Sequence, residues 1–238
     1  SFGAQTYVIL KPGEIICVYS EQNRRQLAHL DVNTGTLAPV DTPFTDIGSI
    51  SLSGQILTFT GASPTGFAAI VNLNLQDGSI TPVKRSCEVS LDSGYLSVPE
   101  AIEFPTADGD VAHGLYYPPA NKDFAAPTAE RPPLIVILHG GPTGSTDTTL
   151  SLARQFWTSR GFALFDVNYR GSTGYGREYR NKLNGRWGIV DVEDTVHGAR
   201  FLVEKGLADP ARLAIRGGSA GGYTVLAALT FTDTFRAG

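Results

Sequence analysis

One serine stands in a setting that could make it a nucleophile. Residues 217–221, Gly-Gly-Ser-Ala-Gly, have the form G-x-S-x-G with Ser219 at the centre, and they lie between a short apolar run and a helical stretch that begins at Ala220. A serine at a sharp turn from a strand into a helix exposes its hydroxyl, and small flanking residues let the backbones pack closely. The amides at the helix start point toward charge that develops on a substrate carbonyl. The motif therefore predicts a nucleophile at Ser219 and an oxyanion-binding N–H at Ala220.

A second glycine-rich turn could supply another oxyanion donor. Residues 139–142, His-Gly-Gly-Pro, follow directly on the aliphatic run 134–138. Glycines at such a strand end let the backbone approach a substrate carbonyl, and an H-G-G sequence is a common source of the second amide. We therefore expect the N–H of Gly141 to act together with that of Ala220. For His139 itself, bracing the loop is favoured over acting as the catalytic base.

A phosphate-binding loop is the alternative interpretation of residues 217–221. The dinucleotide pattern G-x-G-x-x-G does not fit, because Ser219 or Ala220 occupies the second glycine position, depending on whether counting begins at Gly217 or Gly218. The pattern G-x-x-x-x-G-K-[ST] is absent from the chain. Residues 217–221 therefore favour a nucleophilic Ser219 over a phosphate-binding loop.

Three charged residues near other strand and helix ends are further candidates. The glycine-rich run 168–176 follows the apolar run 162–167, and loops at the carboxyl ends of parallel strands line active sites. Arg170 in this run could contact the substrate or hold the loop. Asp191 and Asp194 stand at a helix start, where we expect them as N-cap and dipole partners. The local sequence offers too few further ligands for a metal site, so no metal is expected.

The base that a serine nucleophile needs is not found downstream. In triads built on this kind of turn, an acid and then a histidine follow the serine along the chain. The residues after Ser219 include one acid, Asp233, and no histidine. His197 is expected to be exposed on a helix, which makes it a poor candidate. All four histidines precede the serine: His29, His113, His139 and His197. We therefore expect this chain by itself to be inactive.

The elements around these motifs alternate between strands and helices. Two antiparallel strands are expected over residues 101–104 and 111–117, followed by a Pro/Ala-rich loop over 118–133. Three more strands are expected over residues 134–138, 162–167 and 213–216. Helices are expected between and after them, over residues 148–159, 191–205 and from 220 onward. This alternation indicates a parallel sheet with helices on both faces.

The first hundred residues have another pattern, with short apolar runs, turns and no helical period. Residues 29–40 align with residues 72–83 at an offset of 43 (72 − 29), and each copy has a two-residue turn ending in glycine, Gly35 or Gly78, between two strands. A strand-only repeat of about 40–45 residues is the period of a β-propeller blade. Because two blades cannot close a propeller, we expect the last blades of a larger one; a small β-sandwich is the alternative.

Composition and charge exclude several classes of protein. Hydrophobic residues make up 42% of the chain and charged residues 18%, which excludes a disordered or fibrous chain. A net charge of −4 and the absence of a long apolar run give no reason to expect nucleic acid or a membrane as partner. The two cysteines, Cys17 and Cys87, are too few for a disulfide scaffold or a four-cysteine zinc site. Because the chain has no methionine, even at position 1, we expect it to be a piece of a longer protein. We also expect a cytoplasmic location.

These motifs, in this order and behind blade-like repeats, resemble the prolyl oligopeptidase family of serine peptidases, and most of all its acylaminoacyl-peptidase and dipeptidyl-peptidase-like branch. The resemblance rests on residues 139–142, 168–176, 191–194 and 217–223, and extends over essentially the whole chain. It implies a propeller that admits only short peptides. It also implies Ser219 as nucleophile, Gly141 and Ala220 as oxyanion donors, and a triad Asp and His from a second half of the catalytic domain that this sequence does not contain.

The expected fold is therefore the N-terminal half of an α/β-hydrolase catalytic domain preceded by the last blades of a β-propeller. We expect residues 1–98 to form the partial propeller and residues 99–238 the partial hydrolase, ending after the nucleophile helix. The expected function is hydrolysis of short peptides through an acyl-enzyme on Ser219, with no cofactor. An esterase or lipase-type α/β-hydrolase and a non-catalytic propeller scaffold with a vestigial hydrolase are the alternatives. A peptide is the expected substrate, and a homo-oligomer is left open.

Overall fold

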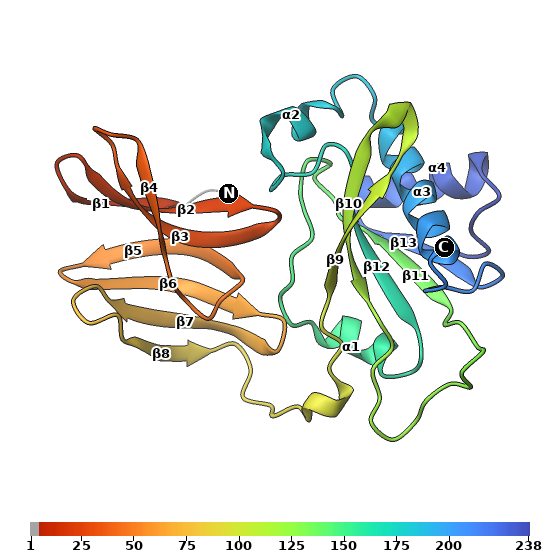
Figure 1. The fold of residues 1–238 in the computed structure, drawn as a ribbon, viewed down its shortest axis with the longest axis horizontal. Helices are drawn as coiled ribbons and strands as arrows, with labels where there is room; N and C mark the ends of the chain where they lie inside the picture. Colours follow the sequence, from red (N-terminus) through yellow and green to blue (C-terminus); the bar gives the residue numbers. More distant parts are fainter. Residues whose placement is uncertain (1–4) are drawn as a thin grey trace. The chain divides into compact units, whose positions relative to one another are not determined.

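The computed structural model describes residues 5–238, which form two compact units (Figure 1). The blade unit comprises the described residues up to Ser90 together with Asp147–Leu150. The sheet-and-helix unit comprises Leu91–Thr146 and Ser151–Gly238. Each unit has a hydrophobic core of its own.

The blade unit consists of two four-stranded antiparallel sheets, in each of which the strands pair in chain order. The first sheet contains β1 (Tyr7–Lys11), β2 (Glu14–Glu21), β3 (Arg24–Asp31) and β4 (Thr36–Val40). The second contains β5 (Asp46–Ser53), β6 (Ile56–Ser63), β7 (Gly66–Asn74) and β8 (Ile80–Arg85). The sequence did not predict β1 or β5. In β5, Gly48 and three serines make the strand pattern weak.

One core joins the two sheets of the blade unit. Successive side chains of a strand point to opposite faces, so each strand can direct every second residue inward. The most deeply buried core residues come from both sheets: Leu27, Ile47, Ile50, Leu57, Phe59 and Val71. Face-to-face packing of four-stranded sheets is the arrangement that the repeat of about 40–45 residues predicts for propeller blades.

The sequence repeat corresponds to a repeated turn. In the first copy, Asp31 Oδ1 accepts a 2.8 Å hydrogen bond from the N–H two residues further on, and its carbonyl accepts another from Gly35. Asn74 and Gly78 make the equivalent contacts in the second copy. Gly35 and Gly78 have φ angles of 73° and 74°, a region that favours glycine. Each turn is longer than the predicted two-residue hairpin, because the Asp31 and Asn74 side chains cap a wider loop.

The sheet-and-helix unit is built on one five-stranded sheet with the order β13-β11-β12-β10-β9. Its parallel part contains β11 (Leu134–Leu138), β12 (Ala163–Asn168) and β13 (Leu213–Gly217). The antiparallel part contains β9 (Glu100–Pro105) and β10 (Val111–Tyr117), where β10 pairs with β12. The expected parallel sheet and the expected antiparallel pair are therefore a single mixed sheet.

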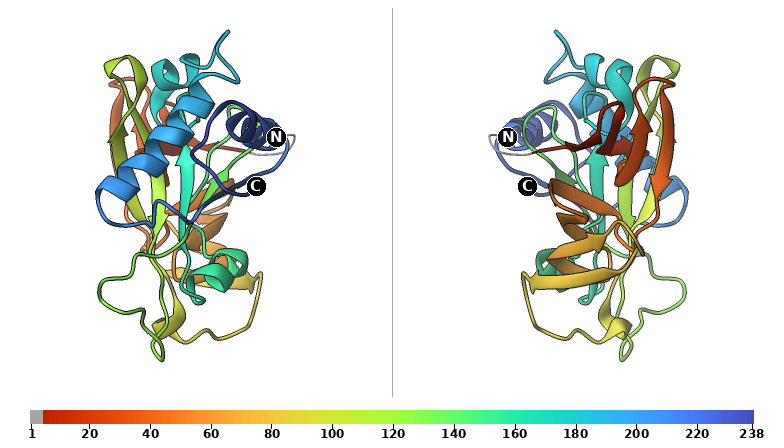
Figure 2. Two further views of the ribbon diagram at one scale, coloured as in Figure 1. Left: turned by 90° about the vertical axis from the view of Figure 1, so that its right-hand side faces the viewer. Right: turned by 90° about the vertical axis from the view of Figure 1, so that its left-hand side faces the viewer.

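Helices cover both faces of this sheet (Figure 2). The helices α3 (Val190–Glu204) and α4 (Ala220–Phe231) pack on one face, and α1 (Leu152–Thr158) packs on the other. The helix α1 is shorter than the predicted 148–159, and the residues before its N-cap, Asp147–Leu150, belong to the blade unit. The short helix α2 (Gly176–Asn181) was not predicted, and two single 3₁₀ turns lie at Ser93–Tyr95 and Ala107–Gly109. In residues 5–238, no helix has the length and apolar character needed to cross a membrane.

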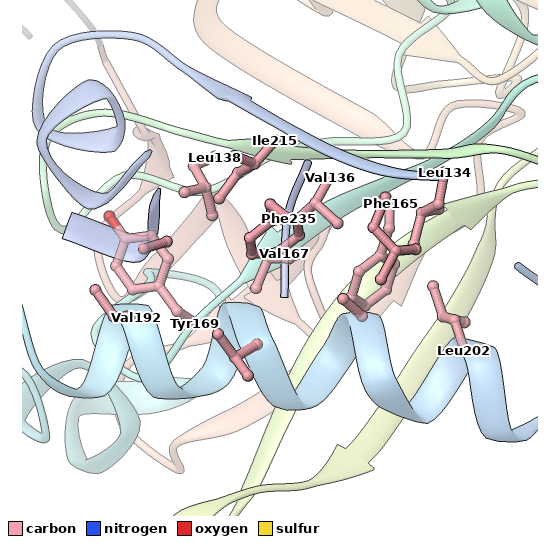
Figure 3. Close-up of a cluster of buried hydrophobic side chains, with 14 of the residues drawn as sticks. Leu134, Val136, Leu138, Phe165, Val167, Tyr169, Val192, Leu202, Ile215 and Phe235 are labelled. Carbon is pink, nitrogen blue, oxygen red and sulfur yellow. The ribbon is translucent and has the colours of Figure 1, made fainter. Parts of the chain in front are cut away.

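The larger core fixes the parallel strands under α3 (Figure 3). Burying each large aliphatic or aromatic side chain contributes about 1.5–3 kcal/mol. In this packed sheet β11 and β13 run parallel with Leu138 opposite Gly217. The segments that leave these two strands, at His139 and at Gly218, therefore begin next to each other. The core side chains that hold the strands in place include Leu134, Val136, Phe165, Val167, Leu202 and Ile215.

Candidate active site

Ser219 occupies a sharp turn between β13 and α4. Its φ and ψ are 55° and −124°, a conformation that side-chain-bearing residues rarely adopt. A methyl group at Gly217 would lie 2.6 Å from the backbone of Gly221, and one at Gly221 would lie 2.6 Å from the carbonyl oxygen of Leu138. The two glycines of G-x-S-x-G are thus required by backbone crowding, and the serine side chain remains exposed.

The glycine loop after β11 lies directly against this turn. A methyl group at Gly140 would lie 3.1 Å from Cβ and 3.6 Å from Oγ of Ser219. Gly141, the next residue, is exposed and has a φ of 127°. The structure therefore brings together residues that the sequence selected from two motifs far apart in the chain. Ala220 is the first residue of α4, where its N–H is not needed for a bond inside the helix.

His139 is engaged on both ring nitrogens within the loop region. Nδ1 lies 2.9 Å from the carbonyl oxygen of Gly140, and Nε2 lies 2.7 Å from Oγ of Ser172. A carbonyl can only accept, so Nδ1 carries the proton and the Ser172 hydroxyl donates to Nε2. The ring also stacks on Tyr169 at 4.5 Å. Burial lowers the pKa of His139, with the bond to Gly140 opposing, so the neutral ring is favoured. These contacts support the bracing role and leave no nitrogen for a base.

Arg170 is almost completely buried, with 2% of its side chain exposed. Its guanidinium lies 2.8 Å from Asp194 and 3.0 Å from Glu193. Burial by itself lowers the pKa of Arg170, but the two carboxylates more than offset this effect, and the group stays charged. Of the two roles expected for Arg170, these contacts support holding the loop.

For the two aspartates of α3, the structure contradicts the expected N-cap role but places Asp191 in the first turn, as expected for a dipole partner. Ile189 is the N-cap residue, so neither aspartate is the cap. Asp191 lies in the first turn, is buried, and accepts hydrogen bonds from the N–H of Gly188 and the hydroxyl of Thr224, which joins α3 to α4. Asp194 is fully buried and bonded to Arg170. Acidic residues near a helix start favour the cap interpretation locally, and only the folded chain brings their distant partners to them.

No base stands beside the serine in the described part of the chain. Within residues 5–238 the Ser219 hydroxyl has no hydrogen-bond partner. His29 pairs with Glu14 in the blade unit, and His113 stacks on Tyr175 at 4.1 Å. His197 is half-buried rather than exposed as predicted, and its Nδ1 lies 2.9 Å from Oγ1 of Thr106. Residues 5–238 also hold no cluster of three or more His, Cys, Asp or Glu side chains suited to a metal ion.

Comparisons with known proteins agree with this geometry. The profile of the prolyl oligopeptidase family matches residues 148–238. A solved structure of a puromycin-hydrolyzing peptidase from Mycobacterium tuberculosis is 41% identical with a TM-score of 0.94, and the match covers 99% of this chain and 36% of that one. The comparison confirms the predicted fold class, with propeller blades followed by the start of an α/β-hydrolase.

Two curated relatives match over shorter stretches. Dipeptidyl peptidase family member 6 of Caenorhabditis elegans is 42% identical over 44% of this chain and 14% of its own length. An acylamino-acid-releasing enzyme of Arabidopsis thaliana is 40% identical over 38% of this chain and 12% of its own length. The chain thus spans well under half of the length of each of these three proteins.

Proposed function

This chain belongs to the prolyl oligopeptidase family, and we propose that it carries the nucleophile and the oxyanion-binding amides of a serine peptidase active site. Ser219 is the proposed nucleophile, and the N–H groups of Gly141 and Ala220 are the proposed oxyanion donors. The proposed substrate is a short peptide. The observation that carries the proposal is the contact of the glycine loop with Ser219 at a strand-to-helix turn of positive φ.

The proposed reaction proceeds by acyl transfer. Ser219 Oγ attacks the carbonyl carbon of a peptide bond as its proton passes to a base, and the oxygen becomes an oxyanion between the two N–H groups. The C–N bond then breaks, the amine leaves with the proton, and the acyl group remains as an ester on Ser219. Water repeats the attack on the ester and releases the acid. Since none of the described residues is bonded to the serine hydroxyl, the base comes from elsewhere in the whole protein.

Covalent labelling tests the nucleophile. In the whole protein, a fluorophosphonate probe is expected to label Ser219, and Ser219→Ala is expected to abolish both labelling and peptide hydrolysis, a loss of about 10⁴-fold or more. In the 238-residue chain, labelling is expected to be absent or very slow, because an unassisted hydroxyl is almost fully protonated. Labelling that persists in the Ser219→Ala whole protein would contradict the proposal.

Two other functions remain as outcomes of further measurements. An esterase would cleave a simple alkyl ester and leave a short peptide amide uncleaved, whereas a peptidase would cleave the amide as well, so both rates are measured on the whole protein. A non-catalytic scaffold would cleave neither, and its sequence after the nucleophile helix would lack an Asp and a His in that order. The names of the matched proteins, which include peptidases, support hydrolysis of a peptide amide.

The organisation of the protein is also part of the proposal. We propose a propeller part over residues 1–98 and a hydrolase part over residues 99–238; support comes from the two compact units, whose first boundary along the chain falls between Ser90 and Leu91. Limited proteolysis that cuts first between residues 86 and 99 would agree with it. The proposed cytoplasmic location is supported by the free thiols of Cys17 and Cys87 and is tested by cell fractionation. Light scattering measures whether the protein is a homo-oligomer.

A further inference from the structure

We propose that Arg170 and Asp194 are positioning residues, which hold the oxyanion loop of residues 139–141 in place through the neighbouring loop of residues 169–174. This inference rests on the proposed function. Neither side chain needs to touch a substrate for this role. The argument follows the contacts from the buried pair to the oxyanion loop.

The pair holds the backbone as well as the side chain at residue 170. Asp194 Oδ2 accepts a 2.6 Å hydrogen bond from the main-chain N–H of Arg170, and Oδ1 accepts a 2.9 Å bond from Nε. Thr106 also donates a 2.6 Å hydrogen bond to Asp194 Oδ1. Asp194 has no exposed surface, so its carboxylate sits in a fixed, dry environment where charge-assisted bonds are strongest. One carboxylate therefore fixes where the loop leaves β12.

Residues on both sides of Arg170 hold the oxyanion loop. Before it, Tyr169 stacks on His139 and donates a 2.6 Å hydrogen bond to the carbonyl oxygen of Pro142. After it, Ser172 donates to His139 Nε2 at 2.7 Å, and the N–H of Thr173 donates to the carbonyl oxygen of Gly144 at 2.9 Å. A displacement of residue 170 would thus reach residues 139–144, which include the oxyanion loop, through three hydrogen bonds and one ring contact.

The loop of residues 169–174 needs such an anchor because its glycines allow the backbone many conformations. Gly171 and Gly174 have φ angles of 122° and 100°, and glycines at such angles lose much conformational freedom on folding. A methyl group at Gly171 would lie 2.6 Å from Cβ of Leu183, so only one packed arrangement fits there. Buried ion pairs contribute little net stability but can select one conformation among several. The pair is suited to that task, since Arg170 keeps its charge at any ordinary pH.

The choice of arginine follows from the surroundings of its guanidinium. Besides Asp194, it lies 3.0 Å from Glu193, 3.8 Å from Asp110 and 3.9 Å from Asp108. A planar group with five N–H donors can face carboxylates in several directions at once, whereas a lysine ammonium is a compact point charge on a flexible stem. Arg170→Lys therefore keeps the charge and loses the directed bonds.

The test uses the whole protein with Arg170→Lys, Ser172→Ala and the double variant. Each single change is expected to lower kcat for a short peptide amide about tenfold or more, because a misplaced oxyanion donor weakens the transition state and not substrate binding. The KM is expected to stay within about twofold. The rate of fluorophosphonate labelling should fall in parallel with kcat. The double variant should lose much less than the product of the two single losses, because both changes act through one loop.

The matched control is Arg186→Gln. Arg186 also pairs with Asp108 and Glu193, at 3.1 Å and 3.7 Å, but contacts neither loop, so its kcat should remain that of the unaltered protein. If Arg170→Lys does not fold, as judged by thermal unfolding, Asp194→Asn takes its place, since it keeps the shape of the side chain and removes the charge. Unchanged kcat in a folded variant of the pair, or losses that multiply in the double variant, would overturn the inference.

Failure of the proposed function has a different signature. If Ser219→Ala retains activity, the nucleophile is wrong, whatever the pair does. If Ser219→Ala is inactive while Arg170→Lys and Asp194→Asn both fold and keep full kcat, the nucleophile stands and the positioning role is overturned.

Discussion

Two turns leave adjacent parallel strands at the same edge of the sheet, and they hold their shapes by different means. The turn at Ser219 is set by backbone against backbone, since Gly217 and Gly221 meet other main-chain atoms at distances that admit no side chain. The loop at Gly140 is crowded as well, since a methyl group at Gly141 or Gly144 would lie 2.5 Å from a main-chain atom, but it also has side-chain contacts: His139, Tyr169 and Ser172 supply hydrogen bonds and a ring contact. Both turns therefore need residues without side chains, and the second also needs the side chains that other elements bring to it.

The difference teaches where each turn is vulnerable. Crowding cannot relax without moving a strand or helix, so changes at the Ser219 turn should cost stability. Hydrogen bonds to a loop can break while the core remains intact, so changes at the Gly140 loop should cost rate more than stability. Each of the following changes separates these two kinds of cost.

The largest effect is expected from His139→Ala. It removes the ring that bonds Gly140 and Ser172, so the proposed oxyanion donor should lose its place and kcat should fall about 100-fold or more in the whole protein. Melting temperature and steady-state kinetics are measured on the same sample. A loss of stability with an unchanged kcat in the folded fraction would contradict this prediction. It would show that His139 stabilises the fold, as expected of the Ser219 turn, and does not position the oxyanion donor.

Next comes Gly221→Ala in the Ser219 turn. The new methyl group would lie 2.6 Å from the carbonyl oxygen of Leu138 and 2.7 Å from that of His139, so the free energy of unfolding should fall by about 1–3 kcal/mol. Gly222→Ala is the matched control, because its methyl group would meet only the Gly217 carbonyl oxygen, at 3.6 Å. Chemical denaturation of both variants decides the matter. Equal stability of the two would show that crowding does not shape this turn.

Gly35→Ala isolates backbone strain from crowding. Gly35 has a φ of 73°, but nothing lies within 4 Å of the position that a methyl group would take. The expected cost is therefore conformational strain only, about 1 kcal/mol in the free energy of unfolding. Urea denaturation followed by fluorescence measures it. A cost as large as that of Gly221→Ala would mean that positive φ, rather than contact, explains both sites.

A smaller effect is expected from acid. Burial lowers the pKa of His139 and of His113 below the ordinary value of 6.5. For His113, Glu103 and Asp110 oppose this shift and Lys182 adds to it. The unfolded chain takes up protons near pH 6.5 and the folded chain only at lower pH, so the free energy of unfolding should fall as the pH drops below about 6.5.

The same pH series tests how much of the pH dependence of stability comes from His139, in the loop at Gly140, and how much from His113. Urea midpoints are compared between pH 8 and pH 5 in the unaltered protein, in His139→Gln and in His113→Phe, which keeps a ring beside Tyr175. Each variant should lose part of the pH dependence. An identical dependence in all three would exclude both histidines as its source.

Much of the fold and of the candidate site could be predicted from short stretches of sequence. The aliphatic run of β11 predicts a strand buried on both faces, and the repeat of residues 29–40 at 72–83, with Gly35 and Gly78 in its turns, predicts the blades, because such patterns depend on neighbouring residues. The roles of Ser219, Gly141 and Ala220 remain predictions from motif and resemblance. What the local pattern missed was short or masked by polar residues, as with α2 and β5.

Contacts between distant residues could not be predicted. Asp194 follows Arg170 by 24 residues and Thr106 precedes Asp194 by 88, and nothing in the residues around any of them indicates the others. Asp191 likewise has the local features of a helix start, and its bond to Thr224 exists only because α3 and α4 pack on the same face of the sheet.

By itself, the sequence determined the turns and strands whose form depends on residues a few positions apart, including the glycines that Ser219 needs on either side. Only the tertiary structure decided which of these segments meet. The register of Leu138 opposite Gly217 sets Gly140 against Ser219, and a buried core of side chains from separate elements sets that register. Burial is non-directional and sums over the whole core, so the partners of a loop residue follow from the packing of every element at once.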